Sequence, residues 1–444
     1  MPEDFTIGDL QLEQLQDMVT KVSMDLRKAK NRKFEGSSVQ DQGFYEIRVV
    51  TPMFGGSAEA GKINEKYPIR SSSIRGHLRF WWRATKGAQF KNEKELYERE
   101  SEIFGNTNRP SSVKIWVDHD EIKNAVSDLQ RNLDPSYVFF PFRENKSSTK
   151  YSKDFSFRLH IEYADQSVRT EIEAALWAWI NFGGIGTRTR RGCGSLYCEY
   201  FSLKESEVHE SKLEKWFQDN MRKYRIEILE QDQVREWPTL STITIQENKK
   251  DIQYAWNEVI EAYKSFRRRA NKGKGRSHWP EADSIRKITG EFETRHKDPI
   301  TISLKKNDIA FPRAQFGLPI VFSFKPGKDP YRTELILSEK KTRLASPVIT
   351  KAIAINEKQG YGAIIVLNQP RIKELVLKKQ RGKVLKKIYA HQIYTSIPTY
   401  KKPEKPGENK DKNPMRNKDQ SYESAIEAFL NSEEVRKWKS GKNS

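Results

Sequence analysis

The sequence predicts an α+β fold, and its first part has the strand and helix order of a ferredoxin-like domain. Apolar side chains alternate strictly from Phe155 to Tyr163, which is typical of a half-buried strand. The next segment, residues 166–182, has apolar side chains at helical spacing and ends at Gly183 and Gly184, where a helix commonly stops. Two successive strand–helix–strand units over roughly 160 residues complete the ferredoxin-like pattern.

The other elements of this region follow from local patterns. In chain order, we predict a strand at 45–50, a helix at 73–86, strands at 113–117, 137–142 and 155–163, a helix at 166–182 and a strand at 195–203. RNA-recognition modules share this fold, although a fold alone does not determine a function.

The second half of the chain is predicted to contain a helical connector, one long helix and several strands. The connector covers about residues 205–236, and a strand in TLSTITIQ precedes a helix through Trp256 and Tyr263. That helix leads into the basic segment FRRRANKGKGR. Later strands are predicted in FGLPIVFSF, TELILS, SPVITKAIAI and GYGAIIVLN, and NEKQG joins the last two as a hairpin turn.

Four parts are expected along the chain. They are a helical N-terminal extension (1–42), a first ferredoxin-like domain (43–204), the connector with a second domain (205–400), and a low-complexity linker with a short C-terminal helix (401–444). The extension is predicted from apolar residues at three- and four-residue spacing between Leu12 and Leu26.

Charge is the strongest signal in the composition. The chain of 444 residues has 80 Lys and Arg against 60 Asp and Glu, a net charge of +20. Such an excess favours polyanionic partners, with nucleic acid first. No apolar run reaches the roughly 18 residues that a membrane-spanning helix needs, and the first residues lack a signal-peptide pattern. Together with only 2 Cys, these features predict a protein of the reducing cytoplasm with no membrane partner.

The stretch GGSAEAGKI, residues 55–63, contains the G-x-x-x-x-G-K core of a phosphate-binding P-loop. A working P-loop needs Ser or Thr after the lysine and a helix that starts there. Ile63 occupies that position, and the following segment contains Pro68. We therefore interpret this stretch as a flexible loop in which Lys62 contacts a phosphate of a nucleic acid strand.

The segment SSSIRGHLRFWWRATKG predicts a helix with one apolar face and one arginine face. Ile74, Leu78, Trp81, Trp82 and Thr85 fall on one side at about 100° per residue. Arg75, Arg79 and Arg83 follow one another at four-residue steps on the adjoining side, with Gly76 leaving a gap among them. Guanidinium groups pair bidentately with phosphates, and the N–H groups near Ser72 suit phosphate oxygens. A solvated arginine face is the alternative, and His77 is interpreted as a packing residue.

A second glycine-rich segment, GGIGTRTRRGCGS (183–195), lies between a predicted helix and a predicted strand. It combines five glycines with three arginines and two threonines. Glycines allow a close approach of the backbone to a polyanion, and arginines and hydroxyls donate to phosphates. The predicted RNA contacts in this loop are Gly184, Gly186, Thr187, Arg188, Arg190 and Arg191. A plain flexible turn is the alternative.

No catalytic residue, metal or cofactor is predicted. Asp118, His119 and Asp120 form a His/Asp cluster without the second histidine pair of a metal phosphohydrolase, so a surface turn is the better explanation. Cys193 and Cys198 have no nearby histidine that could act as a base.

The ordered motifs TPMFGGSAEAG, PIRSSSIRGHLRFWWRA, GGIGTRTRRGCGSL, FPRAQFGLPIVF and RLASPV resemble the RAMP superfamily of CRISPR proteins. Within it they resemble the first RAMP subunit of the Cmr complex, the type III-B CRISPR effector. The motifs run from Thr51 to about Val348, which is most of the chain. The helical extension and the tail after Thr399 lie outside them.

This resemblance implies a particular architecture and role. It implies two ferredoxin-like (RRM-like) domains with glycine-rich loops, plus helical insertions and extensions. It also implies a non-catalytic subunit that caps the assembly near the 3′ end of the guide RNA and helps engage the target RNA beside other Cmr subunits. Arg70, Arg313 and Arg343 match family arginines and join the predicted RNA contacts, although Arg313 and Arg343 could instead be structural.

Two alternatives remain open from the sequence. Metal-independent ribonucleases leave weak motifs, so a RAMP endoribonuclease that processes guide RNA is the second hypothesis. A sequence-independent RNA-binding protein outside CRISPR is the third.

Overall fold

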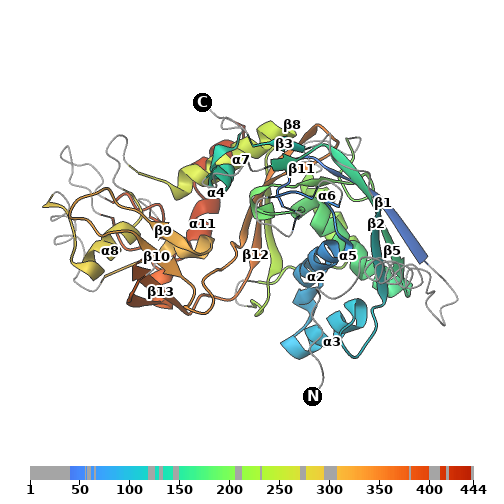
Figure 1. Ribbon diagram of the computed structural model, residues 1–444, viewed down its shortest axis with the longest axis horizontal. Coiled ribbons are helices and arrows are strands. Elements are labelled where there is room, and N and C mark those ends of the chain that lie inside the picture. Colours follow the sequence, from blue (N-terminus) through green and yellow to red (C-terminus); the bar gives the residue numbers. More distant parts are fainter. Residues whose placement is uncertain are drawn as a thin grey trace, which may run out of the picture.

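The structure is a computed structural model. It describes residues 41–55, 57, 62–64, 67–118, 126–129, 134–143, 150–205, 213–230, 233–270, 277–294, 308–379, 382–399, 411–416 and 420–441. Figure 1 shows an elongated molecule, with one sheet toward each end and another between them. The predicted N-terminal helix falls on residues 1–40, outside the described residues.

The first sheet has the strand order β2-β5-β1-β6, and all of its pairs are antiparallel. Its strands are β1 (Asp41–Val49), β2 (Val113–Asp118), β5 (Phe155–Tyr163) and β6 (Leu196–Tyr197). The helix α2 (Ser71–Lys86) follows β1, and α5 (Gln166–Phe182) follows β5. In chain order the strands are one to four, so the sheet reads 2-3-1-4, the order of a ferredoxin-like domain. The α+β class and this first fold are confirmed.

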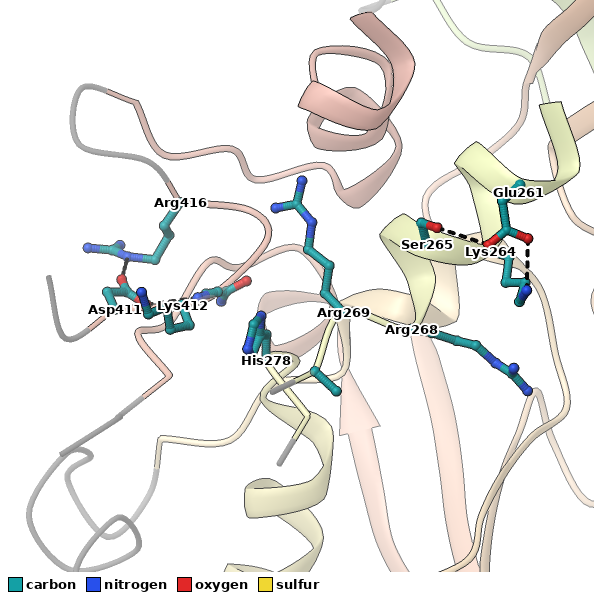
Figure 2. Close-up of a pocket in the computed structure, with 11 residues that line it drawn as sticks. Glu261, Lys264, Ser265, Arg268, Arg269, His278, Asp411, Lys412 and Arg416 are labelled. Carbon is teal, nitrogen blue, oxygen red and sulfur yellow. Dashed lines mark hydrogen bonds and ion pairs between the residues drawn. The ribbon is translucent and has the colours of Figure 1, made fainter. Parts of the chain in front are cut away.

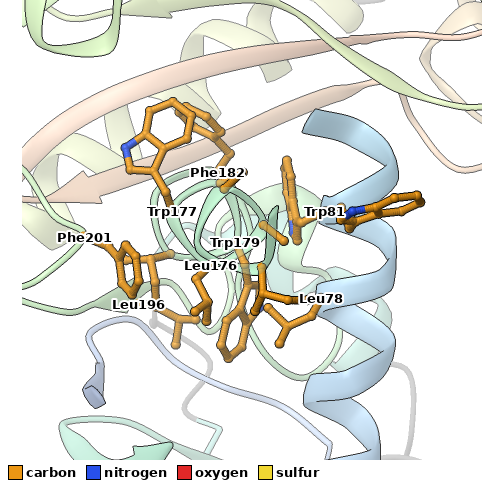
Figure 3. Packing of buried hydrophobic residues seen from close by; sticks show 14 of the residues in the cluster. Leu78, Trp81, Leu176, Trp177, Trp179, Phe182, Leu196 and Phe201 are labelled. Carbon is orange, nitrogen blue, oxygen red and sulfur yellow. The ribbon is translucent and has the colours of Figure 1, made fainter. Parts of the chain in front are cut away.

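Helices α2 and α5 lie side by side and bury a common apolar seam. Figure 3 shows Leu78 and Trp81 of α2 facing Trp179 and Phe182 of α5. All four side chains are at most 3% exposed. The predicted apolar face of α2 is thereby confirmed, because its five apolar-face residues are all buried.

The second sheet has the order β11-β12-β7, and a short strand β8 (Lys250–Asp251) also pairs with β12. Its strands are β7 (Thr239–Ile245), β11 (Val348–Ala354) and β12 (Gln359–Asn368), and α7 (Ile252–Arg267) follows β7 and β8. Numbered along the chain, these three strands lie in the order 2-3-1, which is the ferredoxin-like order without its fourth strand. Among the described residues no strand pairs with the free edge of β7, where the fourth strand of a ferredoxin-like sheet would lie. Instead the C-terminal helix α12 (Glu433–Lys439) packs on α7.

The two ferredoxin-like parts share one apolar core. Residues of the second sheet, including Leu240, Ile349 and Ile353, belong to the same buried cluster as α2 and α5. In Figure 1 the two helices accordingly lie between the first sheet and β12. Interdomain contact is therefore extensive and apolar, which favours a fixed relative placement of the two parts.

A third sheet, β14-β13-β10-β9, forms a separate unit with its own core. Its strands are β9 (Ile320–Phe322), β10 (Thr333–Ile336), β13 (Glu374–Lys379) and β14 (Val384–Tyr389). The helices α8 (Glu281–Thr289) and α10 (Ala390–Ile393) and the turn η8 (Pro312–Phe316) accompany it. Two of its strands precede β11 and two follow β12, so this unit is built from segments on both sides of the β11–β12 hairpin.

The remaining elements connect these units. They are η2 (Gly87–Gln89), α3 (Glu93–Phe104), β3 (Val126–Asp128), α4 (Ser136–Arg143), β4 (Lys150–Ser152), η4 (Thr189–Arg191), α6 (Leu213–Lys223) and α11 (Ala425–Leu430). None of the helices in these described ranges is long and apolar enough to cross a lipid bilayer.

Three predictions about elements were wrong. Residues 137–142 form the helix α4 instead of a strand, because a short apolar run does not distinguish a strand from a buried helical turn. The strand predicted at 195–203 is only Leu196–Tyr197, since a turn begins at Cys198, whose carbonyl accepts from the N–H of Phe201.

The C-terminal segment also differs from its prediction. It forms two short helices rather than one, because Ser432 caps α12 by accepting from the N–H of Val435. Residues 411–416, within the predicted linker, include the fully buried Met415. This part of the tail therefore packs on the second core.

Candidate nucleic-acid interface

The two glycine-rich loops of the sequence meet in the structure. The N–H of Thr187 donates to the carbonyl of Phe54 (2.8 Å), which places residues 183–195 directly against the start of the former P-loop candidate. A Cβ on Gly55 would lie 3.2 Å from the Thr187 methyl group. Strand β1 before this loop is antiparallel to both of its neighbours, unlike the parallel strand of a P-loop.

Much of the second glycine loop is packed against the protein itself. Gly192 has φ +79°, and a Cβ there would overlap the indole nitrogen of Trp256, which donates to the carbonyl of Arg191 (2.7 Å). Gly194 has φ +62°, and a Cβ there would overlap the carbonyl oxygen of Ile185. The predicted contact Gly184 is buried, whereas Gly186 and Thr187 are exposed. Internal packing therefore requires glycines in this loop independently of any ligand.

An arginine cluster joins this loop to the second domain. The cluster consists of Arg188, Arg191, Arg267 and Arg268. Arg191 donates to the hydroxyl of Tyr263 (2.5 Å), and its guanidinium lies 4.3 Å from the centroid of that ring. Arg267 donates to the hydroxyl of Tyr137 (3.2 Å). Throughout the described ranges, none of the four forms an ion pair with a carboxylate.

Burial and the concentration of positive charge shift the pKa of Arg188 and of the neighbouring Tyr137. Burial raises the pKa of Tyr137, but the neighbouring guanidiniums of Arg267, Arg191 and Arg268 outweigh it and lower the pKa overall. Burial and the adjacent Arg191 lower the pKa of Arg188, and its Nε is buried without a hydrogen-bond partner. Buried charge without a counter-charge is costly, so an anion bound here would stabilise the protein.

Arg191 itself has a structural role. It is only 9% exposed, and it also donates to the carbonyl of Val348 (2.7 Å) and to the hydroxyl of Ser346 (3.0 Å). Arg190 donates to the carbonyl of Ser346 and lies over the ring of Phe80. Burial and Arg191 lower the pKa of Arg190 to about 10, so it stays charged at neutral pH.

The three arginines of α2 are engaged by α3. Glu100, which is 2% exposed, accepts from Arg79 (2.7 Å) and from Arg83. Arg75 donates to the carbonyl of Phe104. These side chains therefore fasten α3 to α2, and their charge is partly neutralised. RNA contact by the three remains a prediction.

Gly76 offers a way to test the predicted gap on α2. No heavy atom lies within 4 Å of a Cβ built there, so Gly76→Ala should raise the free energy of unfolding by about 0.5–1 kcal/mol through helix propensity. If an RNA backbone uses the gap, the same variant should bind RNA more weakly. Urea unfolding and fluorescence anisotropy measure the two effects. Unchanged RNA affinity in a stabilised variant would remove this face from the RNA path.

The other predicted contacts are dispersed. Lys62, Arg70 and Ser72 are exposed near the start of α2, and Arg70 is its N-cap. Ser71, Ser72 and Ser73 lie inside the first turn of α2 and do not cap it, because the helix begins at Ser71 and Arg70 precedes it. In the third unit, Arg313 pairs with Glu281 (3.1 Å), which is fully buried, and so is structural. Arg343 is exposed in the segment before β11.

A cavity of about 600 Å³ lies at the end of α7, and its lining includes Arg268 of the arginine cluster (Figure 2). Several cations line it, but most have acidic partners: Lys264 pairs with Glu261 (2.7 Å), and Arg416 pairs with Asp411. Arg269 also pairs, with Glu434. In Figure 2 Arg268 points away from the Asp411–Arg416 pair. The compensated charge makes this cavity a weaker candidate for a polyanion than the arginine cluster.

Sequence patterns did not reveal Tyr137, Arg267, Arg268 and Lys351. Lys351 is fully buried in β11 and donates to the carbonyls of Gly183 (2.8 Å) and Ile180 (3.3 Å) at the end of α5. Burial lowers its pKa to about 7. The basic run FRRRANKGKGR was a visible signal for Arg267 and Arg268, but their proximity to the glycine loop depends on the fold.

Groups suited to catalysis are few. Across the described ranges, no three His, Cys, Asp or Glu side chains come together as metal ligands would. Asp118 pairs with His160 (3.0 Å), while His119 and Asp120 lie outside the described residues. Burial raises the pKa of Cys193 to about 12 and that of Cys198 to about 11, which disfavours a thiolate nucleophile.

Comparison with known proteins agrees with the motifs. Residues 46–197 match the profile of the RAMP superfamily. The Cmr subunit Cmr1-2 of Pyrococcus furiosus is 29% identical over 180 residues, covering 35% of this chain and 94% of that protein. Cmr1-1 of the same organism is 31% identical over 143 residues, covering 30% of this chain and 42% of that protein.

Solved structures are similar at lower identity. The crystal structure of Cmr1 from Pyrococcus furiosus is 19% identical, with a TM-score of 0.44 over 75% of this chain and 89% of that one. A chain of the type III-B Cmr-beta complex bound to cognate target RNA is 14% identical, with a TM-score of 0.44 over 74% of this chain and 94% of that one. The resemblance found in the motifs is confirmed: residues 46–197 match the RAMP-superfamily profile, and the chain is similar to the Cmr1 subunits of Pyrococcus furiosus.

Proposed function

We propose that this chain is a non-catalytic RNA-binding subunit of a type III-B CRISPR (Cmr) ribonucleoprotein effector that acts in antiviral defence. Its proposed partners are guide CRISPR RNA, target RNA and other RAMP subunits of the complex, in the cytoplasm. The similarity to Cmr1 subunits and the RAMP-superfamily match of residues 46–197 support this assignment. The finer proposal is that it caps the complex near the 3′ end of the guide RNA and helps engage the target.

The arginine cluster is the observation that carries the RNA-binding proposal. Four guanidiniums converge where the glycine loop meets α4 and α7, and none has a carboxylate partner in the described parts of the chain. Elsewhere Arg79, Arg83, Arg269 and Arg313 are each paired with a carboxylate, and Arg75 donates to a backbone carbonyl. A phosphodiester chain supplies the missing negative charge, and Arg is well suited to it.

RNA binding and cleavage by the full chain, purified with and without Cmr partner subunits, test the proposal. Affinity for single-stranded RNA should fall with salt, with a log–log slope of about −0.7 for each neutralised phosphate. Repeat RNA incubated with the protein in EDTA should stay intact. A discrete cut would favour the guide-processing endoribonuclease. Tight binding with no association with Cmr subunits would favour an RNA-binding protein outside CRISPR.

A further inference from the structure

A small cavity lies between α2 and the glycine-rich loop, beside the arginine cluster. Its volume is about 160 Å³. The helix α2 lines one side with His77, Phe80 and Trp81. The end of α5 and the glycine-rich loop line the rest with Phe182, Gly183, Gly184, Thr189 and Arg190, and β11 adds Ile349. The two elements predicted independently to contact RNA therefore enclose one cavity.

Aromatic rings form the apolar part of this cavity. Phe80 is half-buried and meets Trp81 edge to face, with centroids 5.3 Å apart. Trp81 in turn contacts Phe182 at 6.2 Å. The guanidinium of Arg190 lies 5.4 Å from the centroid of Phe80 and extends this flat surface. Rings and guanidinium planes are the surfaces on which proteins stack unpaired bases.

Three polar side chains provide hydrogen-bonding capacity at the same cavity. His77 stacks on Trp179, and burial lowers its pKa to about 4, so the imidazole is neutral and offers one donor and one acceptor. Within the described residues, neither His77 nor the hydroxyl of Thr189 has a hydrogen-bond partner. Arg190 donates to Ser346 through one nitrogen only, which leaves other N–H donors for a ligand.

We propose that this cavity receives one nucleobase of the bound RNA, turned out of the strand while the backbone follows the arginine cluster. The inference rests on the proposed RNA-binding function and adds a base-specific site to it. Pockets for drug-sized ligands have volumes of about 300–1,000 Å³, so this smaller cavity suits a single ring system rather than a whole nucleotide. Neutral donors and acceptors beside aromatic rings suit a base, whereas the charged cluster suits its phosphates.

Fluorescent RNA locates the site without any substitution. Single-stranded RNAs with 2-aminopurine at successive positions are mixed with the full chain, because the fluorescence of this base rises when it leaves its stacked neighbours and changes again on an aromatic surface. We expect a change confined to one position, because the proposed site is a single cavity. A uniform response along the RNA, or none while anisotropy reports binding, would overturn the base pocket and leave RNA binding intact. Absence of RNA binding would overturn the proposed function itself.

A pair of variants tests the role of the Phe80 ring in RNA binding. Phe80→Leu keeps an apolar side chain but removes the stacking surface, and it should weaken RNA binding about tenfold and abolish the position-specific fluorescence change. Tyr331→Leu is the matched control, because Tyr331 is 80% exposed and lies before β10 in the third unit. Phe80→Leu should leave the salt slope unchanged, since no phosphate contact is lost. Equal affinities of the two variants for RNA, or a Phe80→Leu effect only on binding of a partner subunit, would contradict the proposal.

Discussion

Replacing Arg188 with Gln should weaken RNA binding about tenfold without lowering the free energy of unfolding. Arg188 lies at the loop tip in a left-handed conformation (φ +60°), and its Nε has no partner. The lost charge-assisted bond to phosphate accounts for the affinity, and the salt slope should become less negative by about 0.7. Stability should be unchanged or higher, because the substitution removes a poorly solvated charge beside Arg191. Fluorescence anisotropy over a salt series and urea unfolding measure both effects.

Arg191→Gln provides the contrast to Arg188→Gln. Its guanidinium is held by Val348, Tyr263 and Ser346, so its loss leaves buried polar groups unsatisfied and should cost about 3 kcal/mol of stability. Arg191→Lys should recover only part of this, because an ammonium cannot reproduce the planar fork. If Arg188→Gln unfolds the protein as readily as Arg191→Gln, or leaves the salt slope unchanged, the loop tip is not the phosphate contact.

The fold was largely predictable from local patterns where segments are long. The helices α2, α5 and α7 and the strand β5 have clear periodicity, and β11 and β12 are long apolar runs. The order of the elements from β1 to β6 gives the first ferredoxin-like sheet. The helix α4 was mistaken for a strand because its apolar run is short. The third sheet was missed as a unit, since β10 pairs with β13 across the whole β11–β12 hairpin. Pairing at that distance leaves no local signal.

The candidate site was predictable as a set of residue types but not as a set of contacts. The sequence placed Arg188 and Arg190 beside flexible backbone, and it placed arginines at four-residue steps on α2. It did not reveal that Glu100 holds Arg79 and Arg83, or that Tyr137 and Tyr263 bring Arg267 and Arg191 together. These partners come from distant segments, and only the packed fold decides which arginine keeps its charge uncompensated.

Substitution of a glycine in the loop is the second change with a large expected effect, here on the free energy of unfolding. Gly194→Ala should lower the free energy of unfolding by about 3–5 kcal/mol. A left-handed φ of +62° costs a non-glycine residue about 1–2 kcal/mol, and the new Cβ would also overlap the carbonyl oxygen of Ile185. Gly290→Ala is the matched control, because Gly290 has φ +70° with no atom within 4 Å of a Cβ. It should cost only about 1 kcal/mol, and urea unfolding measures the difference.

That difference separates two explanations for the glycine-rich loop. If packing on the protein is the main reason for the glycine, Gly194→Ala is far more destabilising than Gly290→Ala even without RNA, and its RNA affinity falls only as its folded fraction falls. If the glycine serves the RNA backbone directly, the two variants are equally stable without RNA, and Gly194→Ala loses affinity while folded. The buried position of Gly194, whose N–H donates to the carbonyl of Pro52 (3.0 Å), favours the first outcome. The loop then acts as a rigid support for Arg188, with Gly192 and Gly194 packed against the core.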